Sequence, residues 1–175
     1  MNTTIRLGTE EDIDELEQLY NGLNDHLSAT TNYPGWRKGV YPIRETAVEG
    51  INERCLYVAV CNDRIVGAII LRHEPEPAYL QAVWRKELDY EEVFVIYTLV
   101  VHPDYLGQGI GQALLYFASE FGRQSNIKSL RLDVYENNLP AISLYEKCGF
   151  EYIDKVDLGL GKYNLDWFRL YEKFL

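Results

Sequence analysis

The sequence predicts an α/β fold in which short strands alternate with amphipathic helices. Some segments place apolar residues at helical spacing. Others are short apolar runs of strand length with turn-forming residues on either side. One such run, residues 93–101, leads through a glycine-spaced turn into a helical pattern that starts near residue 110. No linker, repeat or low-complexity segment interrupts the chain, so we expect residues 1–175 to form a single domain.

The first third of the chain predicts one strand and two helices. Residues 5–7 are the expected first strand, and Thr9 is the expected N-cap of a helix with an acidic first turn. Residues 28–42 predict a loop rich in Thr, Asn, Pro, Gly and aromatic residues, and a shorter helix is expected over residues 44–51. Helical spacing defines the buried stripe of the first helix: Ile13, Leu16, Leu19, Tyr20, Leu23 and Leu27.

The remainder predicts six further strands and two further helices. Residues 55–61 and 65–71 are expected to pair as a hairpin through Asn-Asp-Arg. Residues 73–90 contain two prolines and are expected to be mostly connection. The later elements are a strand over 93–101, a helix from 110, a strand over 130–135, a helix from Pro140 to Gly149, and strands over 150–158 and 167–174.

Composition narrows the class of protein. Hydrophobic residues make up 47% and charged residues 25%, which is ordinary for a folded soluble protein, and no apolar run is long enough to span a membrane. The net charge of −10 argues against nucleic-acid binding and is compatible with cationic substrates such as amines. Cys55, Cys61 and Cys148 have no metal-ligand spacing, so we expect buried thiols, no metal and, without a signal peptide, a cytoplasmic protein.

The segment between residues 101 and 115 predicts an anion site. Gly107, Gly109 and Gly111 take alternate positions between a strand and a helix, where glycine lets the backbone approach a ligand closely. The first N–H groups of a helix lack internal partners, and the helix dipole favours negative charge there. A Rossmann fold would place these glycines after its first strand, and a P-loop would need a lysine followed by serine or threonine. The turn therefore indicates a phosphate-bearing cofactor of another kind.

The chain resembles the GNAT superfamily of acyl-CoA-dependent N-acetyltransferases in two motifs and in its order of elements. Residues 99–105, followed by the turn over 107–111, are similar to the pyrophosphate turn of the family. The later helix motif matches at Asn138, Ala141, Leu144, Tyr145, Gly149 and Phe150. The resemblance implies a three-layer fold, with a mixed, mostly antiparallel sheet of about seven strands and helices on both faces.

The resemblance also implies acetyl-CoA as co-substrate. The pantetheine arm would bond to the backbone of Leu99 and Val101, and an N–H near Leu99 or Val100 would stabilise the oxyanion. Asn138 would bond the cofactor from the other side. The amides expected to bind the pyrophosphate are those of Gly107, Gln108, Gly109, Ile110, Gly111 and Gln112. The family usually has arginine or glutamine where this chain has Leu106, so we expect weaker cofactor binding than in relatives with arginine.

Catalytic roles follow from the same resemblance. Tyr145 matches the general acid that protonates the leaving thiolate, although its helix face would also suit a core aromatic residue. Glu92 is the expected general base, with a solvated acid at a strand start as the alternative. His73 is a further titratable group, and an acceptor amine of low pKa would need no base. The expected acceptor-binding residues are Trp36, Tyr41 and Tyr97.

The expected function is transfer of an acetyl group from acetyl-CoA to a primary amine of a small molecule or peptide, by direct attack in a ternary complex. Two alternatives stay open: an acyl-CoA sensor without catalysis, and an assembly protein with a vestigial cofactor site. We expect no nucleic-acid or membrane partner, and we expect a homodimer from the frequency of dimers in the family.

Overall fold

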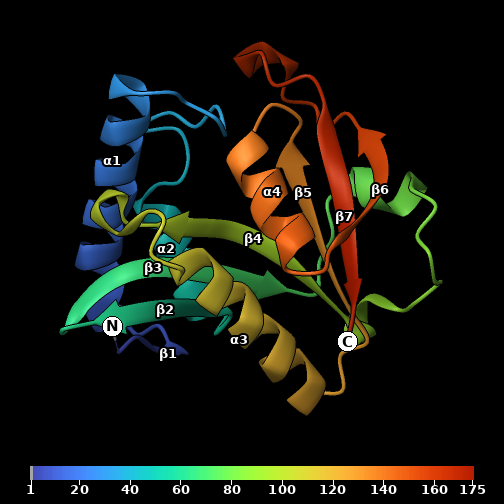
Figure 1. Ribbon diagram of the computed structural model, residues 1–175, viewed down its shortest axis with the longest axis horizontal. Helices are drawn as coiled ribbons and strands as arrows, with labels where there is room; N and C mark the ends of the chain where they lie inside the picture. The colour runs from blue at the N-terminus through green and yellow to red at the C-terminus, as the bar shows by residue number, and fades with distance from the viewer. Residues whose placement is uncertain (1) are drawn as a thin grey trace. The chain divides into compact units, whose positions relative to one another are not determined.

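The computed structural model describes residues 2–175, in which seven strands form a mixed sheet in the order β1-β2-β3-β4-β5-β7-β6 (Figure 1). Strand β4 is parallel to β5, whereas the β1–β2, β2–β3, β5–β7 and β6–β7 pairs are antiparallel. The strands are β1 (Thr4–Leu7), β2 (Leu56–Cys61), β3 (Arg64–Arg72), β4 (Val93–Val101), β5 (Ser129–Tyr135), β6 (Glu151–Val156) and β7 (Phe168–Phe174). The helices are α1 (Ile13–Ala29), α2 (Arg44–Asn52), α3 (Ile110–Gln124) and α4 (Leu139–Lys147). The expected mixed, mostly antiparallel sheet of about seven strands is confirmed.

The contacts of the chain divide it into two compact units, and β4 and α3 each contribute to both. The first unit comprises residues 2–32, 36–71 and 97–117. The second unit comprises residues 33–35, 72–96 and 118–175.

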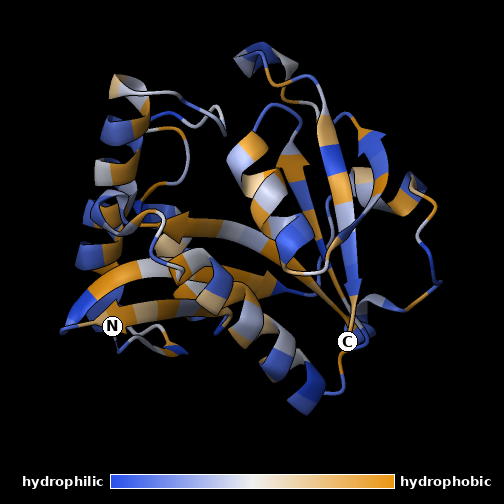
Figure 2. Cartoon of the chain, viewed as in Figure 1, coloured by the Kyte–Doolittle hydropathy of each residue, from blue (hydrophilic) through white to orange (hydrophobic). Residues whose placement is uncertain are grey.

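In the first unit, helices cover both faces of the strands. Residues of α1, α2, β2, β3 and β4 form one buried apolar cluster, with Leu16, Tyr20, Ala47, Val58 and Ile70 among its members. On the other face, a Cβ at Gly67 of β3 would lie 2.9 Å from the Ile110 side chain, so glycine there lets α3 pack closely. Strands β3 and β4 are buried along most of their length, and they carry much of the apolar colour in Figure 2.

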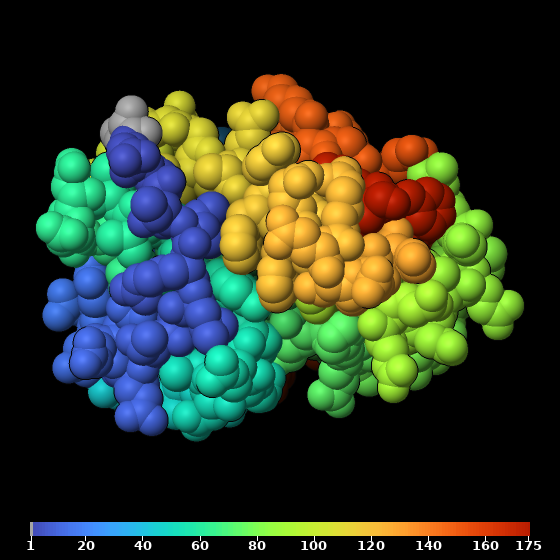
Figure 3. Space-filling view, turned by 90° about the horizontal axis from the view of Figure 1, so that it is seen from below, coloured from blue at the N-terminus to red at the C-terminus, as the bar shows by residue number. Residues whose placement is uncertain are grey.

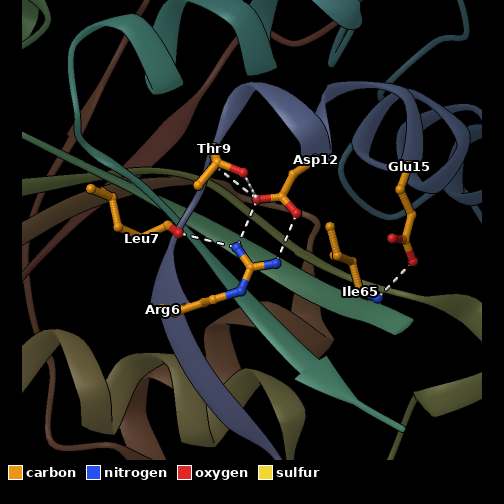
Figure 4. A network of polar contacts seen from close by, with 6 residues as sticks. All are labelled: Arg6, Leu7, Thr9, Asp12, Glu15 and Ile65. Carbon is orange, nitrogen blue, oxygen red and sulfur yellow. Dashed lines mark hydrogen bonds and ion pairs between the residues drawn. The ribbon is translucent and has the colours of Figure 1, made fainter. Parts of the chain in front are cut away.

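Asp12 ties the start of α1 to β1 in the first unit (Figure 4). Its two oxygens accept hydrogen bonds from the Arg6 guanidinium, at 2.7 Å to Oδ2 and 2.8 Å to Oδ1. The Thr9 N–H donates to Oδ2 as well, at 2.8 Å. These donors bind the charged carboxylate, and the Arg6 guanidinium is the main cause of the lowered pKa of Asp12. Glu15 adds a second tie, because its side chain accepts the N–H of Ile65 at 2.7 Å.

In the second unit, a buried ion pair lies among β5, β7 and the connection that precedes β4. The Arg131 Nε donates to Glu172 Oε2 at 2.7 Å, and both side chains are almost completely buried. The Arg131 guanidinium also lies 4.2 Å from the ring centre of Trp84 and 5.3 Å from that of Tyr90. Arg131 Nη2 donates to the carbonyl of Lys86 at 3.0 Å, so one cation anchors the connection onto the sheet.

Several boundaries differ from the expected ones for local reasons. Thr9 precedes a short 3-10 turn, Glu10–Asp12, that leads into α1. The connection after β3 contains another such turn, Pro77–Gln81. Strand β6 ends at Val156, two residues early, because the Asp157 side chain accepts the N–H of Gly159 and turns the chain. Cys61 is buried as expected, whereas Cys55 and Cys148 lie at element ends and are partly exposed.

Candidate functional site

The glycine turn of the first unit lies between the end of β4 and the start of α3. Gly107 and Gly109 adopt φ values of +74° and +83°, a left-handed conformation that other residues rarely adopt. A Cβ at either glycine would meet no heavy atom within 4 Å, so packing does not require glycine there. The backbone conformation does, and the space beside the turn is open. These features fit a ligand that contacts the backbone.

The amides at the start of α3 point toward that space by helix geometry. The Ala113 N–H donates to the Gly109 carbonyl at 2.9 Å, which begins the helical ladder. The amides of Ile110, Gly111 and Gln112 precede it, so they have no carbonyl one turn earlier within the helix. Three such donors and the positive end of the helix dipole suit a pyrophosphate. The residues present therefore fit the phosphate part of coenzyme A.

Charge at this turn comes from few side chains. Leu106 is half exposed and brings neither charge nor a hydrogen bond. The Gln108 side chain donates to the Asp104 carbonyl at 2.9 Å and so supports the turn itself. The Arg64 guanidinium lies 2.7 Å from His102 Nε2, and burial together with that cation lowers the pKa of His102. Histidine is therefore neutral here at pH 7, and the backbone amides are the main donors for an anion.

Strand β4 supplies the segment on which the pantetheine arm is expected. Leu99 and Val101 are partly buried and alternate with the buried Val100. Just before them, Thr98 has a φ of +48°, which interrupts the extended backbone of the strand. A non-glycine residue in this conformation costs about 1–3 kcal/mol and persists only where its surroundings hold it. The parallel pairing of β4 with β5 covers Val93–Val95, earlier in the strand.

The three expected acceptor-binding residues share one region of the first unit. The rings of Trp36 and Tyr41 meet edge to face, with centroids 5.4 Å apart. The Tyr41 hydroxyl forms a short hydrogen bond with Thr98 Oγ1. Trp36 and Tyr97 are both partly buried against the apolar cluster of the unit. The structure therefore brings Trp36 and Tyr41 together, and Tyr41 contacts Thr98, the residue that follows Tyr97 on β4.

The second unit holds the residues of the later helix motif. Asn138 is the N-cap of α4, and its side chain accepts the N–H of Ala141 at 3.4 Å. Tyr145 is 7% exposed and packs edge to face on Phe150, with ring centroids 5.9 Å apart. Burial of the ring is compatible with both interpretations of Tyr145, the core aromatic and the proton donor.

Glu92 and His73 also lie in the second unit. Glu92 ends a short 3-10 turn and is partly exposed, and its carbonyl accepts the N–H of Lys128 at 2.7 Å. His73 Nδ1 lies 2.9 Å from the carbonyls of Tyr90 and Val93. Carbonyls only accept, so this nitrogen carries the proton and cannot act as a base.

Asp133 on β5 is a titratable residue that the sequence reasoning missed. The Tyr79 hydroxyl donates to its Oδ2 at 2.6 Å. Burial raises the pKa of Asp133 to about 6, and the nearby Glu76 contributes in the same direction. The sequence held one signal for this residue: a single acid between two apolar residues of a strand, Leu-Asp-Val. A carboxyl with this pKa is ionised at pH 7 and can accept a proton.

Two features are absent from residues 2–175. No group of three or more His, Cys, Asp or Glu side chains in this part of the chain is arranged to hold a metal ion. None of its helices has the length and apolar character that crossing a membrane requires.

Known proteins share this sequence pattern and fold. The chain is 27% identical over 154 residues to an uncharacterized N-acetyltransferase of Methanocaldococcus jannaschii, covering 85% of this chain but only 60% of that protein. An acetyltransferase of the GNAT family from Streptococcus agalactiae has the same fold at 18% identity, with a TM-score of 0.80 over 99% of this chain and 95% of that one. The PaiA N-acetyltransferase from Thermoplasma acidophilum, solved with coenzyme A, superposes with a TM-score of 0.71 at 20% identity and covers both chains fully.

A family model provides the assignment. The model of the acetyltransferase (GNAT) family matches residues 16–150, which include the glycine turn, β4, β5 and the motif of α4. This span is most of the chain, and the folds of the solved acetyltransferases agree with it. The chain belongs to the GNAT family of acetyltransferases.

Proposed function

We propose that this chain transfers an acetyl group from acetyl-CoA to a primary amine of a small molecule or peptide, by direct attack in a ternary complex. The observation that carries the proposal is the glycine turn at the start of α3, with its left-handed glycines and open space. On a chain of the GNAT family, such a turn suits the pyrophosphate of coenzyme A.

We propose the cofactor contacts that the two family motifs imply for this chain. The expected pyrophosphate amides run from Gly107 to Gln112, but the Gln108 N–H donates to the Tyr105 carbonyl at 3.3 Å and supports the turn instead. The other amides of this segment would bind the pyrophosphate, and the backbone of Leu99 and Val101 would bond the pantetheine arm. An N–H near Leu99 or Val100 would face the thioester oxygen, where a donor gains strength as negative charge develops. Asn138 would add a contact through its remaining hydrogen-bonding capacity. No metal takes part in this proposal.

The chemistry requires two proton transfers. The amine nitrogen attacks the thioester carbon, the C–S bond breaks, and the thiolate of coenzyme A leaves. Tyr145 would give its phenolic proton to that sulfur, since a phenol of ordinary pKa is protonated at neutral pH. The proton that the amine loses would pass to a base and from there to solvent.

Two carboxyl groups of the second unit are proposed as that base. Glu92 is the candidate from the sequence, because it directly precedes β4. Asp133 is favoured by its environment, because burial raises its pKa to about 6, close to the operating pH of an effective base. Substitution of each carboxyl separates the two.

The acceptor is proposed to bind beside the aromatic group of Trp36, Tyr41 and Tyr97 in the first unit. The Trp36 and Tyr41 rings can contact the carbon skeleton of an amine. The net charge of −10 raises the local concentration of cationic acceptors.

A second candidate function is an acyl-CoA sensor that binds without turnover, and Leu106 is the observation that favours it. This exposed leucine stands where the family usually carries a residue that bonds phosphate. A cytoplasmic location, a homodimer and the function of residues 1–175 as a single domain stay predictions from the sequence.

An amine and peptide panel with acetyl-CoA tests the proposed function, with release of free thiol as the readout. We expect release that depends on the amine, at a rate well above hydrolysis in its absence. Binding of acetyl-CoA without release for any amine or peptide would contradict transfer and favour the sensor. No binding of coenzyme A at millimolar concentration would contradict both.

A further inference from the structure

Two polar atoms on α1 are buried without a partner. Tyr20 is 0% exposed and Asn24 is 2% exposed, one helical turn apart on the face that packs against the sheet. Within residues 2–175, neither the Tyr20 hydroxyl nor Asn24 Oδ1 has a hydrogen-bond partner. A buried polar atom left without a partner costs about 1–3 kcal/mol, so a pair of them needs an explanation.

The other two such atoms of the described chain, on Tyr90 and Glu172, lie beside a buried ion pair. They flank Arg131, which bonds the second oxygen of Glu172 and lies over the Tyr90 ring. An ion pair holds that cluster together. The Tyr20 and Asn24 cluster contains no ion pair, so charge does not compensate for its open hydrogen bonds.

The neighbours of Tyr20 and Asn24 belong to the expected acceptor region of the first unit. Asn24 Nδ2 donates to the Tyr41 carbonyl at 3.1 Å, and the Tyr41 hydroxyl bonds Thr98 Oγ1. Thr98 is the residue with a left-handed backbone in β4, immediately before Leu99. The rings of Trp36 and Tyr41 pack edge to face. Open hydrogen bonds, irregular backbone and aromatic rings therefore occur in one place.

We propose that the Tyr20 hydroxyl and Asn24 Oδ1 form a subsite for the N–H groups of a primary amine, bound in its neutral form as the acetyl acceptor. The inference rests on the proposed function and names the groups that hold its acceptor. The side-chain amide oxygen can only accept, so the occupant must donate. The Tyr20 oxygen can accept a second N–H, which leaves the lone pair of the nitrogen free to attack.

The uncharged nature of the cluster determines which protonation state binds. Burial raises the pKa of the Tyr20 phenol, so the hydroxyl is neutral at physiological pH. The side chains of Asn24 and Thr98 carry no charge. An ammonium ion would lose its hydration without gaining an opposite charge, whereas a neutral amine avoids that cost.

Access to the subsite depends on Tyr41. Tyr20 and Asn24 are covered in the described conformation, while Tyr41 is partly exposed and belongs to the loop between α1 and α2. An amine that enters would take over hydrogen bonds of the cluster as Tyr41 moves off Thr98. Binding and loop movement are therefore coupled in this proposal.

The test uses Tyr20→Phe and Asn24→Leu with four primary amines as probes: methylamine, ethanolamine, benzylamine and tyramine. Amine binding is measured by saturation-transfer NMR, which needs no turnover, and thiol release is followed separately. We expect at least one amine to bind the wild type, with an affinity about fivefold lower in each variant. Tyr116→Phe is the matched control, because Tyr116 lies 67% exposed on α3, whose outer side reaches the surface in Figure 3.

The outcomes separate the subsite from the proposed function. Equal amine affinity in the wild type and both variants, or no binding of any of the four amines to the wild type, would overturn the subsite. A lowered melting temperature of Tyr20→Phe with unchanged amine affinity would show a structural hydroxyl instead. Amine binding that depends on Tyr20 without any thiol release would support the subsite while contradicting acetyl transfer.

Discussion

Buried polar groups near the start of α1 and further along the helix differ in their hydrogen bonding. At the N-terminal end, the carboxylate of Asp12 accepts from Arg6 and from Thr9, so both of its oxygens are bonded. Further along the same helix, the Tyr20 hydroxyl and Asn24 Oδ1 have no partner within residues 2–175. A complete hydrogen-bond network, as at Asp12, stabilises the fold. An incomplete network beside irregular backbone, as at Tyr20 and Asn24, is where we propose that a ligand binds. Removing a group of the first kind should reduce stability, and removing one of the second kind should reduce binding or turnover.

The largest expected effect concerns the general base. Asp133→Asn should lower turnover about a hundredfold, the size typical of a lost acid or base. In the wild type, turnover should fall as the pH drops through about 6, the pKa that burial confers on Asp133. Because the folded pKa lies above the unfolded one, ionisation of Asp133 costs stability above about pH 4. The asparagine variant should therefore melt at the same or a higher temperature at pH 8.

Glu92→Gln is the control for this prediction. A full loss of turnover in Glu92→Gln together with normal turnover in Asp133→Asn would assign the base to Glu92. Steady-state thiol release between pH 5 and 9 measures both variants.

Asp12→Ala tests the structural half of the comparison. The free energy of unfolding should fall by about 2–3 kcal/mol, because hydrogen bonds to a charged group are lost and the Arg6 guanidinium loses its partner. Asp14→Ala is the control: Asp14 pairs with Arg44 on the surface and should cost less than about 1 kcal/mol. Urea unfolding measures both, and equal losses would break the comparison.

The lowered pKa of Asp12 also predicts how the stability difference between the wild type and Asp12→Ala depends on pH. Its folded pKa is lowered, so its contribution to stability is complete above the unfolded value of about 3.9. The contribution is lost as the pH falls through the folded pKa. The difference in stability between the wild type and Asp12→Ala should be the same at pH 7 and pH 5 and should shrink below about pH 4.

Tyr145→Phe tests a group that we propose acts in the reaction rather than in the stability of the fold. Turnover should fall at least about tenfold, which corresponds to about 1.4 kcal/mol of transition-state stabilisation, while the melting temperature stays unchanged. Near-normal turnover would show that the buried Tyr145 ring is only a core aromatic residue.

Leu106→Arg should improve cofactor binding by a smaller amount. An arginine at this half-exposed position can reach a phosphate without burial and should lower the dissociation constant of acetyl-CoA about fivefold. Calorimetry measures the constant, and Leu80→Arg, at an exposed position of the second unit, is the control for added charge. An unchanged constant in Leu106→Arg would remove the leucine as an explanation for weak binding.

The smallest expected loss is that of stability in Tyr20→Phe. The Tyr20 hydroxyl gives up no hydrogen bond on removal, and the cost of burying an unpartnered hydroxyl goes with it, so the free energy of unfolding should stay the same or rise, by up to about 1–3 kcal/mol. A loss as large as that of Asp12→Ala would place Tyr20 with the structural groups and break the comparison.

Much of the fold could be predicted from the sequence, because its signals are local. The helical stripe of α1, the hairpin at β2 and β3 and the turn before α3 all follow from spacing and from glycine positions. The order of strands β5, β7 and β6 was not predicted, because periodicity marks each strand but not which strands pair.

Candidate site residues come from the sequence only where a motif marks them. The proposed roles of the glycine turn and Tyr145 rest on such motifs and stay predictions. Asp133 was missed because its pKa depends on burial and on Tyr79, 54 positions away. The open hydrogen bonds of Tyr20 and Asn24 were missed because Tyr20 belongs to the expected apolar stripe of α1, Asn24 was not singled out, and the lack of a partner is a property of the folded chain.

The central claim is that backbone amides of the glycine turn bind the pyrophosphate of acetyl-CoA, and amide NMR tests it most directly. Titration of ¹⁵N-labelled protein with acetyl-CoA should shift the amide signals of Gly109, Ile110, Gly111 and Gln112 strongly. Inorganic pyrophosphate should shift the same four signals at higher concentration. If acetyl-CoA leaves these four amides unmoved while other signals shift, the cofactor binds elsewhere and the account is wrong.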